Sequence, residues 1–287
     1  MSYDKNIYLK LLSENKFEEA NSYRTDNMPK SLFKYISLNG DTSCEQFKKV
    51  CKINFDLNEL KFNSLQHNKL WLSTFENLND PFEYKALFLD TQKLEAHNYP
   101  IDYIESAFKS IKDMFVITSF TTTAIDNMPM WAHYSNNHQG FCIEYEVISP
   151  RMIFPISYEK NRNPIASIIT HYMNIANKLS KREITEDNND YQKYVHIMLH
   201  SAFIKHESWM YEDLYRLVYI NPKELPSGVS YPLDTLGLKV KRIFIGRCCS
   251  AENRQRLVDT ARHNGFEVFD VILEEQSKLY RLETKVI

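Results

Sequence analysis

The chain has 287 residues, of which 43% are hydrophobic, enough to fill the core of one elaborated domain. Its 35 basic and 37 acidic side chains nearly balance, which excludes a strong overall attraction to nucleic acid or to an anionic membrane but leaves local basic patches open. The 6 glycines and 10 prolines exclude a fibrous or low-complexity chain.

Residues 4–24 have the spacing of one capped helix, and residues 1–30 are expected to form an N-terminal helical extension. After this extension, we expect a single domain over residues 31–287. Its first half is predicted to contain a strand at 32–36, a helix near 57–66, a strand at 70–73, a helix at 101–114 and a strand at 115–120.

The second half begins with a short helix around Trp131, and two further helices are predicted between residues 166 and 207, inside a helical insertion over about 162–207. The other predicted elements are a strand at 141–147 that 152–158 extends in the same sheet, strands near 214–220 and 238–245, a helix at 253–264 that ends at Gly265, and a strand pair at 266–273 and 279–286. Strands and helices mix without regular βαβ alternation. The sequence therefore predicts an α+β fold with a mixed, largely antiparallel central sheet and flanking helices.

Cysteine usage indicates a reducing compartment. The five cysteines are odd in number, form no C-x-x-C pair and include two direct neighbours, which make a poor disulfide: Cys44, Cys51, Cys142, Cys248 and Cys249. The first ten residues lack a basic segment followed by an apolar one. No apolar run approaches the roughly 20 residues that span a bilayer. We therefore expect a cytoplasmic protein without a membrane partner.

The helix around Trp131 is the most informative segment. Met130, Trp131 and Tyr134 are helical neighbours at i,i+3 and i,i+4 spacing, so their side chains could form the wall of a pocket for a base or a nicotinamide. His133 or Tyr134 could donate hydrogen bonds to such a ligand. The alternative is an amphipathic helix whose aromatic rings pack on the sheet, since aromatic stripes usually serve cores.

Two groups of acidic and polar residues could carry other chemistry. Asn79, Asp80 and Glu83 surround a turn fixed by proline, where they could contact a ligand or form a structural turn. Glu144 and Glu146 project from one face of a strand and, with Asp80, could hold Mg²⁺ in a nuclease. A solvent-facing strand also explains this glutamate pair.

A histidine pair and a lone arginine complete the candidates. His196, His200 and Glu207 are expected on one helical stripe, where they could bind Zn²⁺ or face solvent. Arg216 lies in an otherwise apolar strand, just after Glu212, and therefore needs a carboxylate partner or a polar cavity. The chain contains no P-loop, no G-x-G-x-x-G pattern and no nucleophile elbow.

Several of these segments together resemble a bacterial family catalogued as domain of unknown function 2971. The resemblance covers about residues 31–246 and is carried by five elements: Leu32-Phe-Lys-Tyr35, Leu70-Trp-Leu-Ser73, Leu78-Asn-Asp-Pro-Phe-Glu83, Met130-Trp-Ala-His-Tyr134 with Gly140, and Trp209-x-Tyr-Glu212 with Arg216. In the family a second glutamate usually follows, and this chain has Leu214 at that position.

More distantly, the order of elements resembles the ADP-ribosyltransferase fold, especially toxins that modify DNA. This resemblance implies NAD as substrate, Glu212 and Tyr134 as catalytic residues, and a cofactor site that comprises Lys34, Tyr35, Ser119, Trp131, His133 and Arg216. Glu212 would stabilise the positive charge that develops on the ribose as nicotinamide leaves. An aromatic ring would stack on nicotinamide, and Lys34 would contact phosphate.

The resemblance implies an NAD-dependent effector, a toxin or an anti-phage defence protein, which acts on a nucleic-acid or protein acceptor and has an antitoxin or defence partner. A second hypothesis is a module without catalysis that binds a nucleotide or senses phage. The metal-dependent nuclease is the third.

Overall fold

The computed structural model describes residues 3–39, 57–96, 98, 100–123, 125–164, 166–220 and 227–287. Cys44 and Cys51 lie outside these residues. The helices are α1 (Lys5–Ser13), α2 (Phe17–Asp26), α4 (Leu57–Gln66), α5 (Thr91–Ala96), α6 (Ile101–Asp113), α7 (Met128–Tyr134), α8 (Ala166–Ser180), α9 (Asn189–His200) and α10 (Ala251–Asn264). None of the described helices has both the length and the apolar character that crossing a membrane requires.

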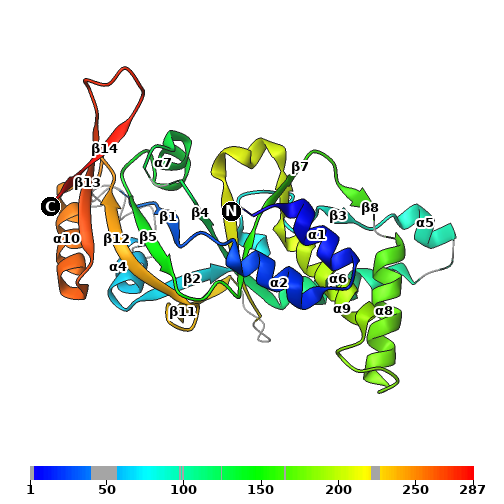
Figure 1. Ribbon diagram of the computed structural model, residues 1–287. Helices are drawn as coiled ribbons and strands as arrows, with labels where there is room; N and C mark the ends of the chain where they lie inside the picture. Colours follow the sequence, from blue (N-terminus) through cyan, green and yellow to red (C-terminus); the bar gives the residue numbers. More distant parts are fainter. Residues whose placement is uncertain are drawn as a thin grey trace, which may run out of the picture.

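A curled, mostly antiparallel sheet of ten strands forms the centre of the molecule (Figure 1). Its main path runs in the order β11-β2-β4-β1-β5-β12-β13-β14, and β10 pairs with both β4 and β6 beside this path. The strands of the sheet are β1 (Ser31–Ile36), β2 (Lys69–Ser73), β4 (Phe115–Thr121), β5 (Phe141–Val147), β6 (Ile153–Pro155), β10 (Leu214–Ile220), β11 (Gly228–Pro232), β12 (Leu238–Ile245), β13 (Glu267–Leu273) and β14 (Leu282–Val286). The predicted mixed α and β class with a largely antiparallel sheet is confirmed.

Local sequence signals explain where several elements begin and end. The hydroxyl of Ser250 caps α10 by accepting a hydrogen bond from the Asn253 amide, and Gly265, with φ 75°, ends the helix. The single helix predicted at 4–24 is wrong, because the chain forms α1 and α2 instead. They are separated at Asn15, whose φ of 59° lies in the left-handed region that asparagine tolerates.

The insertion also differs from its prediction. The second helix was expected to reach Glu207, but α9 ends at His200. Residues 204–206 instead form β9 (Ile204–His206), which pairs in parallel with β7 (Ser157–Glu159) in a separate small sheet. Only β6 within 152–158 joins the main sheet. The other small sheet pairs β3 (Leu87–Phe88) with β8 (Asn163–Pro164).

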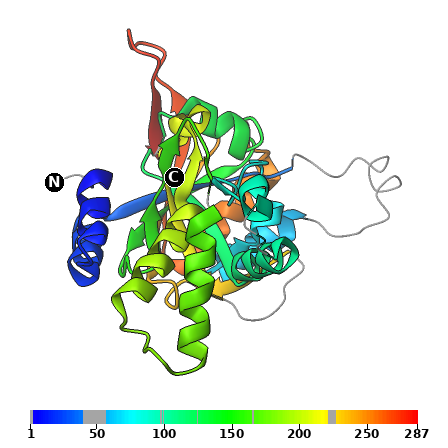
Figure 2. The same ribbon diagram turned by 90° about the vertical axis from the view of Figure 1, so that its right-hand side faces the viewer.

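The two N-terminal helices lie on the outside of the molecule (Figure 2). Arg24 is buried and donates hydrogen bonds from its guanidinium to the carbonyl oxygens of Pro150 and Arg151, both at 3.0 Å. Phe17 stacks on His196 of α9 with ring centroids 5.1 Å apart. These contacts attach α2 to the rest of the fold.

The pairing of β4 leaves an opening in the sheet. One edge of β4 pairs with β10 over its full length. The other edge meets two strands, β2 at Ser73–Ile117 and β1 at Phe33–Thr121. Residues 118–120 lie between these two contacts and have no strand partner on that edge within the described chain. We call this opening the β1–β2 gap.

Candidate functional site

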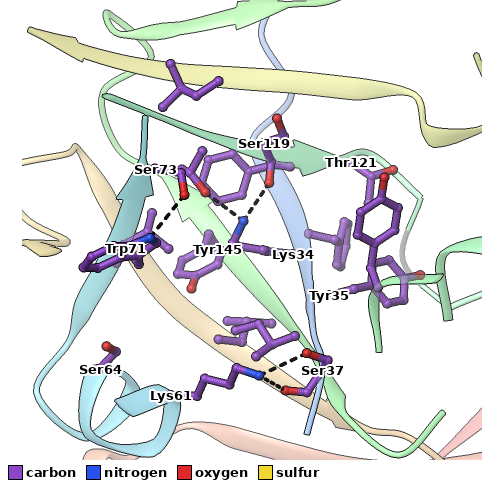
Figure 3. A pocket seen from close by; sticks show the side chains of 18 of the residues that line it. Lys34, Tyr35, Ser37, Lys61, Ser64, Trp71, Ser73, Ser119, Thr121 and Tyr145 are labelled. Atoms are coloured by element: carbon purple, nitrogen blue, oxygen red, sulfur yellow. Dashed lines mark hydrogen bonds between the residues drawn. The ribbon is translucent and has the colours of Figure 1, made fainter. Parts of the chain in front are cut away.

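A cavity of about 770 Å³ occupies the β1–β2 gap (Figure 3). Residues of β1, β2 and β4 line it, together with residues of β5 and α4. Because the strands separate here, the backbone of β4 faces the cavity without a neighbouring strand to accept its hydrogen bonds. Water, a side chain or a ligand can satisfy these groups.

Lys34 of β1 fills part of this role. Its ammonium group donates hydrogen bonds to Thr118 Oγ1 at 2.7 Å and to the carbonyl oxygen of Ser119 at 3.2 Å, across the gap in Figure 3. Burial lowers the pKa of Lys34 to about 8, and no described carboxylate offsets that effect. Lys34 therefore brings a poorly solvated positive charge to the cavity wall.

The cavity wall carries more positive than negative charge. Among the described residues that line it, the charged side chains are four lysines and one glutamate: Lys34, Lys61, Lys69, Lys205 and Glu83. Lys61 of α4 donates to the carbonyl and hydroxyl oxygens of Ser37 at 2.7 and 3.0 Å. This excess of cations favours an anionic ligand.

Aromatic rings and hydroxyl groups make up much of the remaining wall. Tyr35, Tyr145 and Phe120 contribute rings, and Trp71 lies nearly half-exposed on β2. Burial raises the pKa of both Tyr35 and Tyr145, so their phenols keep their protons and serve as hydrogen-bond donors. The sequence prediction placed Lys34, Tyr35 and Ser119 in one cofactor site, and all three line this cavity.

Beside the cavity, Glu212 belongs to a buried network. Its Oε1 accepts a hydrogen bond from Tyr134 Oη, and its Oε2 lies 2.7 Å from Lys205 Nζ. Asn79 Nδ2 donates to the same Tyr134 hydroxyl at 2.8 Å. Burial and the bond to Glu212 raise the pKa of Tyr134. Tyr134, Lys205 and Asn79 line the cavity, whereas the fully buried Glu212 does not.

Glu83 and Arg216 continue this network. Arg216 Nη2 lies 2.8 Å from Glu83 Oε1, and Lys205 Nζ lies 4.0 Å from the same oxygen. Two carboxylates thus meet two cations, so Arg216 has the carboxylate partner that its place in an apolar strand requires. The other carboxylate oxygen of Glu83, Oε2, is buried without a hydrogen-bond partner among the described residues.

Trp131 is fully buried and is not part of the cavity wall. Its indole makes a T-shaped contact with Tyr35, with centroids 4.9 Å apart, and stacks on His138 at 5.5 Å. Its Nε1 donates to the carbonyl oxygen of Ile125 at 2.9 Å. The indole therefore belongs to the core in this structure, and its role is to hold α7 against β1.

Two other residues singled out from the sequence, His133 and Asp80, are not part of the cavity wall. His133 is exposed and its Nδ1 lies 3.0 Å from Tyr211 Oη. Asp80 is buried and accepts a hydrogen bond from the Phe82 amide at 2.9 Å, so it forms the structural turn that was one of its two interpretations.

The predicted nuclease centre is not assembled. Within the described chain, no three metal-ligating side chains gather at one point. Glu144 is buried and pairs with Lys241 and Arg242 of β12, at 3.2 and 3.4 Å. Glu146 is exposed. Asp80 and Glu144 therefore serve separate local contacts, and Glu146 faces solvent.

The predicted histidine stripe is also wrong, because α9 ends before Glu207. His196 contacts the Gln192 carbonyl oxygen, and burial lowers the pKa of His200 to about 4. Lys205 was not singled out from the sequence. The feature that could have identified it is its position four residues before Trp209. The Trp209 ring centroid lies 4.2 Å from Lys205 Nζ.

Comparison with known proteins supports a family resemblance for part of the chain. No curated protein and no solved structure matches the chain. The model of a family described as "Protein of unknown function (DUF2971)" matches residues 130–217, from α7 through β10, and this match supports the family resemblance that the Met130-Trp-Ala-His-Tyr134 and Trp209-x-Tyr-Glu212 elements predicted.

Proposed function

We propose that the cavity in the β1–β2 gap binds a nucleotide, with NAD as the first candidate. The observation that carries this proposal is the Lys34 ammonium, which lines the cavity without a described carboxylate partner. A partly buried cation without a counter-charge is costly to keep unless a ligand supplies one. The cavity volume of about 770 Å³ suits a ligand of this size.

Glu83 offers the cavity a hydrogen-bond acceptor, which complements the positive charge of Lys34. Its orphan oxygen can accept a hydrogen bond from a ligand donor, and a ribose hydroxyl or an amide nitrogen supplies one. A nucleotide combines such donors with phosphate for Lys34 and a flat ring for the aromatic wall. Inorganic phosphate alone would leave the rings and Glu83 unused.

Calorimetric titration with NAD, ADP and inorganic phosphate tests this proposal. The substitution Lys34→Met should weaken nucleotide binding about tenfold or more, because it removes a poorly solvated charge–phosphate contact of roughly 1.5–3 kcal/mol. Lys34→Arg should retain most of the affinity. Lys239→Met is the matched control, since Lys239 is exposed on β12 and lies outside the cavity wall.

Transfer of ADP-ribose from NAD is a second candidate. The specific observation in its favour is that Tyr134 lines the cavity while its hydroxyl contacts Glu212. In this reaction the bond between nicotinamide and ribose breaks, nicotinamide leaves with the bonding electrons, and a nucleic-acid or protein nucleophile takes its place and loses a proton. Tyr134 would couple the developing positive charge to the Glu212 carboxylate.

Release of nicotinamide from NAD in the presence of DNA, RNA or cell lysate tests this second candidate. Tyr134→Phe should lower the rate while NAD binding persists. An intact NAD pool with every acceptor would leave nucleotide binding as the function. A toxin or phage-defence role, with an antitoxin or defence partner, further requires that expression of the active chain depletes NAD and stops bacterial growth.

A further inference from the structure

The last strand of the sheet, β14, has a free edge. Within the described chain it pairs only with β13, and residues 283–287 are exposed. The β13–β14 hairpin projects from one end of the molecule in both views (Figures 1 and 2). An exposed strand edge is a template for another strand.

The ladder with β13 shows which groups face outward. The Ile287 amide donates to the Val268 carbonyl oxygen at 3.2 Å, and the Glu274 amide donates to the Arg281 carbonyl oxygen at 3.2 Å. The odd-numbered residues of β14 therefore bond to β13, because such bonds alternate along an antiparallel strand. The backbone groups of Thr284 and Val286 face the free edge. The Leu282 amide is already bonded to Asp126 Oδ1 at 3.1 Å.

We propose that β14 pairs with β14 of a second copy of this chain, antiparallel and centred on Thr284, to form a twofold-symmetric dimer. The sequence of the strand, Leu-Glu-Thr-Lys-Val, supports this register. A twofold axis at Thr284 places Glu283 directly opposite Lys285 of the second copy, and the symmetric pair repeats this contact. The strand is complementary to itself in charge.

The geometry strengthens this charge match. Glu283 and Lys285 fall at positions without backbone bonds to the second copy, where facing residues approach most closely, to about 4.5 Å between Cα atoms. Val286, which is 72% exposed in the single chain, would lie opposite Leu282 of the second copy, whose side chain stays in the core of its own chain. Thr284 would face Thr284. Opposite charges and paired threonines both stabilise cross-strand contacts.

Sedimentation of the full chain over a range of concentrations tests the dimer. We expect reversible dimerisation, which Glu283→Lys and Lys285→Glu each weaken about tenfold, because each places like charges opposite each other twice. The double variant should recover the wild-type dissociation constant. Mixing the two single variants should give a heterodimer, since their charges then complement each other at both positions.

Two further variants separate pairing through β14 from association through another surface. Thr284→Pro removes only an outward-facing amide and should abolish the dimer while the fold persists. Glu275→Lys with Lys278→Glu, in the exposed turn of the same hairpin, should change nothing. A chain that stays monomeric from about 1 µM to 1 mM would overturn the proposal. A dimer that Glu283→Lys, Lys285→Glu and Thr284→Pro all leave unchanged would overturn it too, because it would not use β14.

Discussion

Lys34 is the residue on which the proposed site depends. Lysines are almost never buried without a partner, because the ammonium group loses its hydration. Here the ammonium has only the neutral oxygens of Thr118 and Ser119. Neutral acceptors hold the side chain in place across the gap but leave its charge available to a phosphate group.

Glu212 must be tested with its partner, because it is also a structural residue. Glu212→Gln should lower the free energy of unfolding by about 3–5 kcal/mol, since Lys205 loses its 2.7 Å counter-charge in a buried site. Urea unfolding measures this loss. The double variant Glu212→Gln with Lys205→Met should recover most of it. If Glu212→Gln unfolds at the wild-type urea concentration, the network does not contribute as described.

At the scale of elements, the site exists because β1 and β2 share one edge of β4 and separate between their two contacts. Several neighbours fix the position of β1. On its other side β1 pairs with β5 over six residues, from Ser31–Glu146 to Ile36–Phe141. Trp131 of α7 also packs against Tyr35 of β1. The turn that connects α7 to β5 holds the end of β1, because Asn136 in this turn donates a hydrogen bond to the Leu38 carbonyl oxygen at 2.9 Å.

Gly140 in that turn lies against the end of β1. A Cβ atom at Gly140 would come 1.9 Å from the Ile36 carbonyl oxygen, so the backbone of one segment would have to move. Gly140→Ala should therefore lower the free energy of unfolding by about 3 kcal/mol. It should also weaken nucleotide binding, because β1 carries Lys34.

Gly265→Ala is the comparison for this prediction. It has open space around the new Cβ and only an unfavourable φ of 75°, so it should cost about 1 kcal/mol and leave binding unchanged. Equal losses in the two variants, measured by urea unfolding, would show that the close approach of Gly140 to β1 is unimportant.

At the scale of the whole molecule, hydrophobic periodicity was sufficient to predict most elements of the sheet. Strands such as β1, β4 and β5 are rich in apolar and β-branched residues, which favour a strand that packs on a core, although charged residues interrupt β1 and β5. β11 was missed because it is short, ends in Pro232 and lies at the edge of the sheet, where pairing rather than pattern decides.

Some residues of the cavity wall, such as Lys34, Tyr35 and Ser119, were singled out from the sequence, but their arrangement around a cavity was not. The resemblance to known families pointed to Lys34, Tyr134 and Glu212, whereas Arg216 stood out as a charged residue in an otherwise apolar strand. Which of them share a cavity depends on strand register, which no local pattern records. The β1–β2 gap exists only because strands far apart in the sequence meet on β4. The pairing of Glu212 with Lys205 likewise depends on how the chain folds.

The pH dependence of nucleotide binding is the most direct measurement of the central claim. Lys34 should be charged below its pKa of about 8 and neutral above it, so calorimetry should show NAD affinity falling as the pH rises through 8. Lys34→Arg should bind with nearly constant affinity over this range, because arginine keeps its charge. Wild-type affinity that does not change across pH 8, or that changes equally in Lys34→Arg, would contradict the assignment of Lys34 as the phosphate-binding cation.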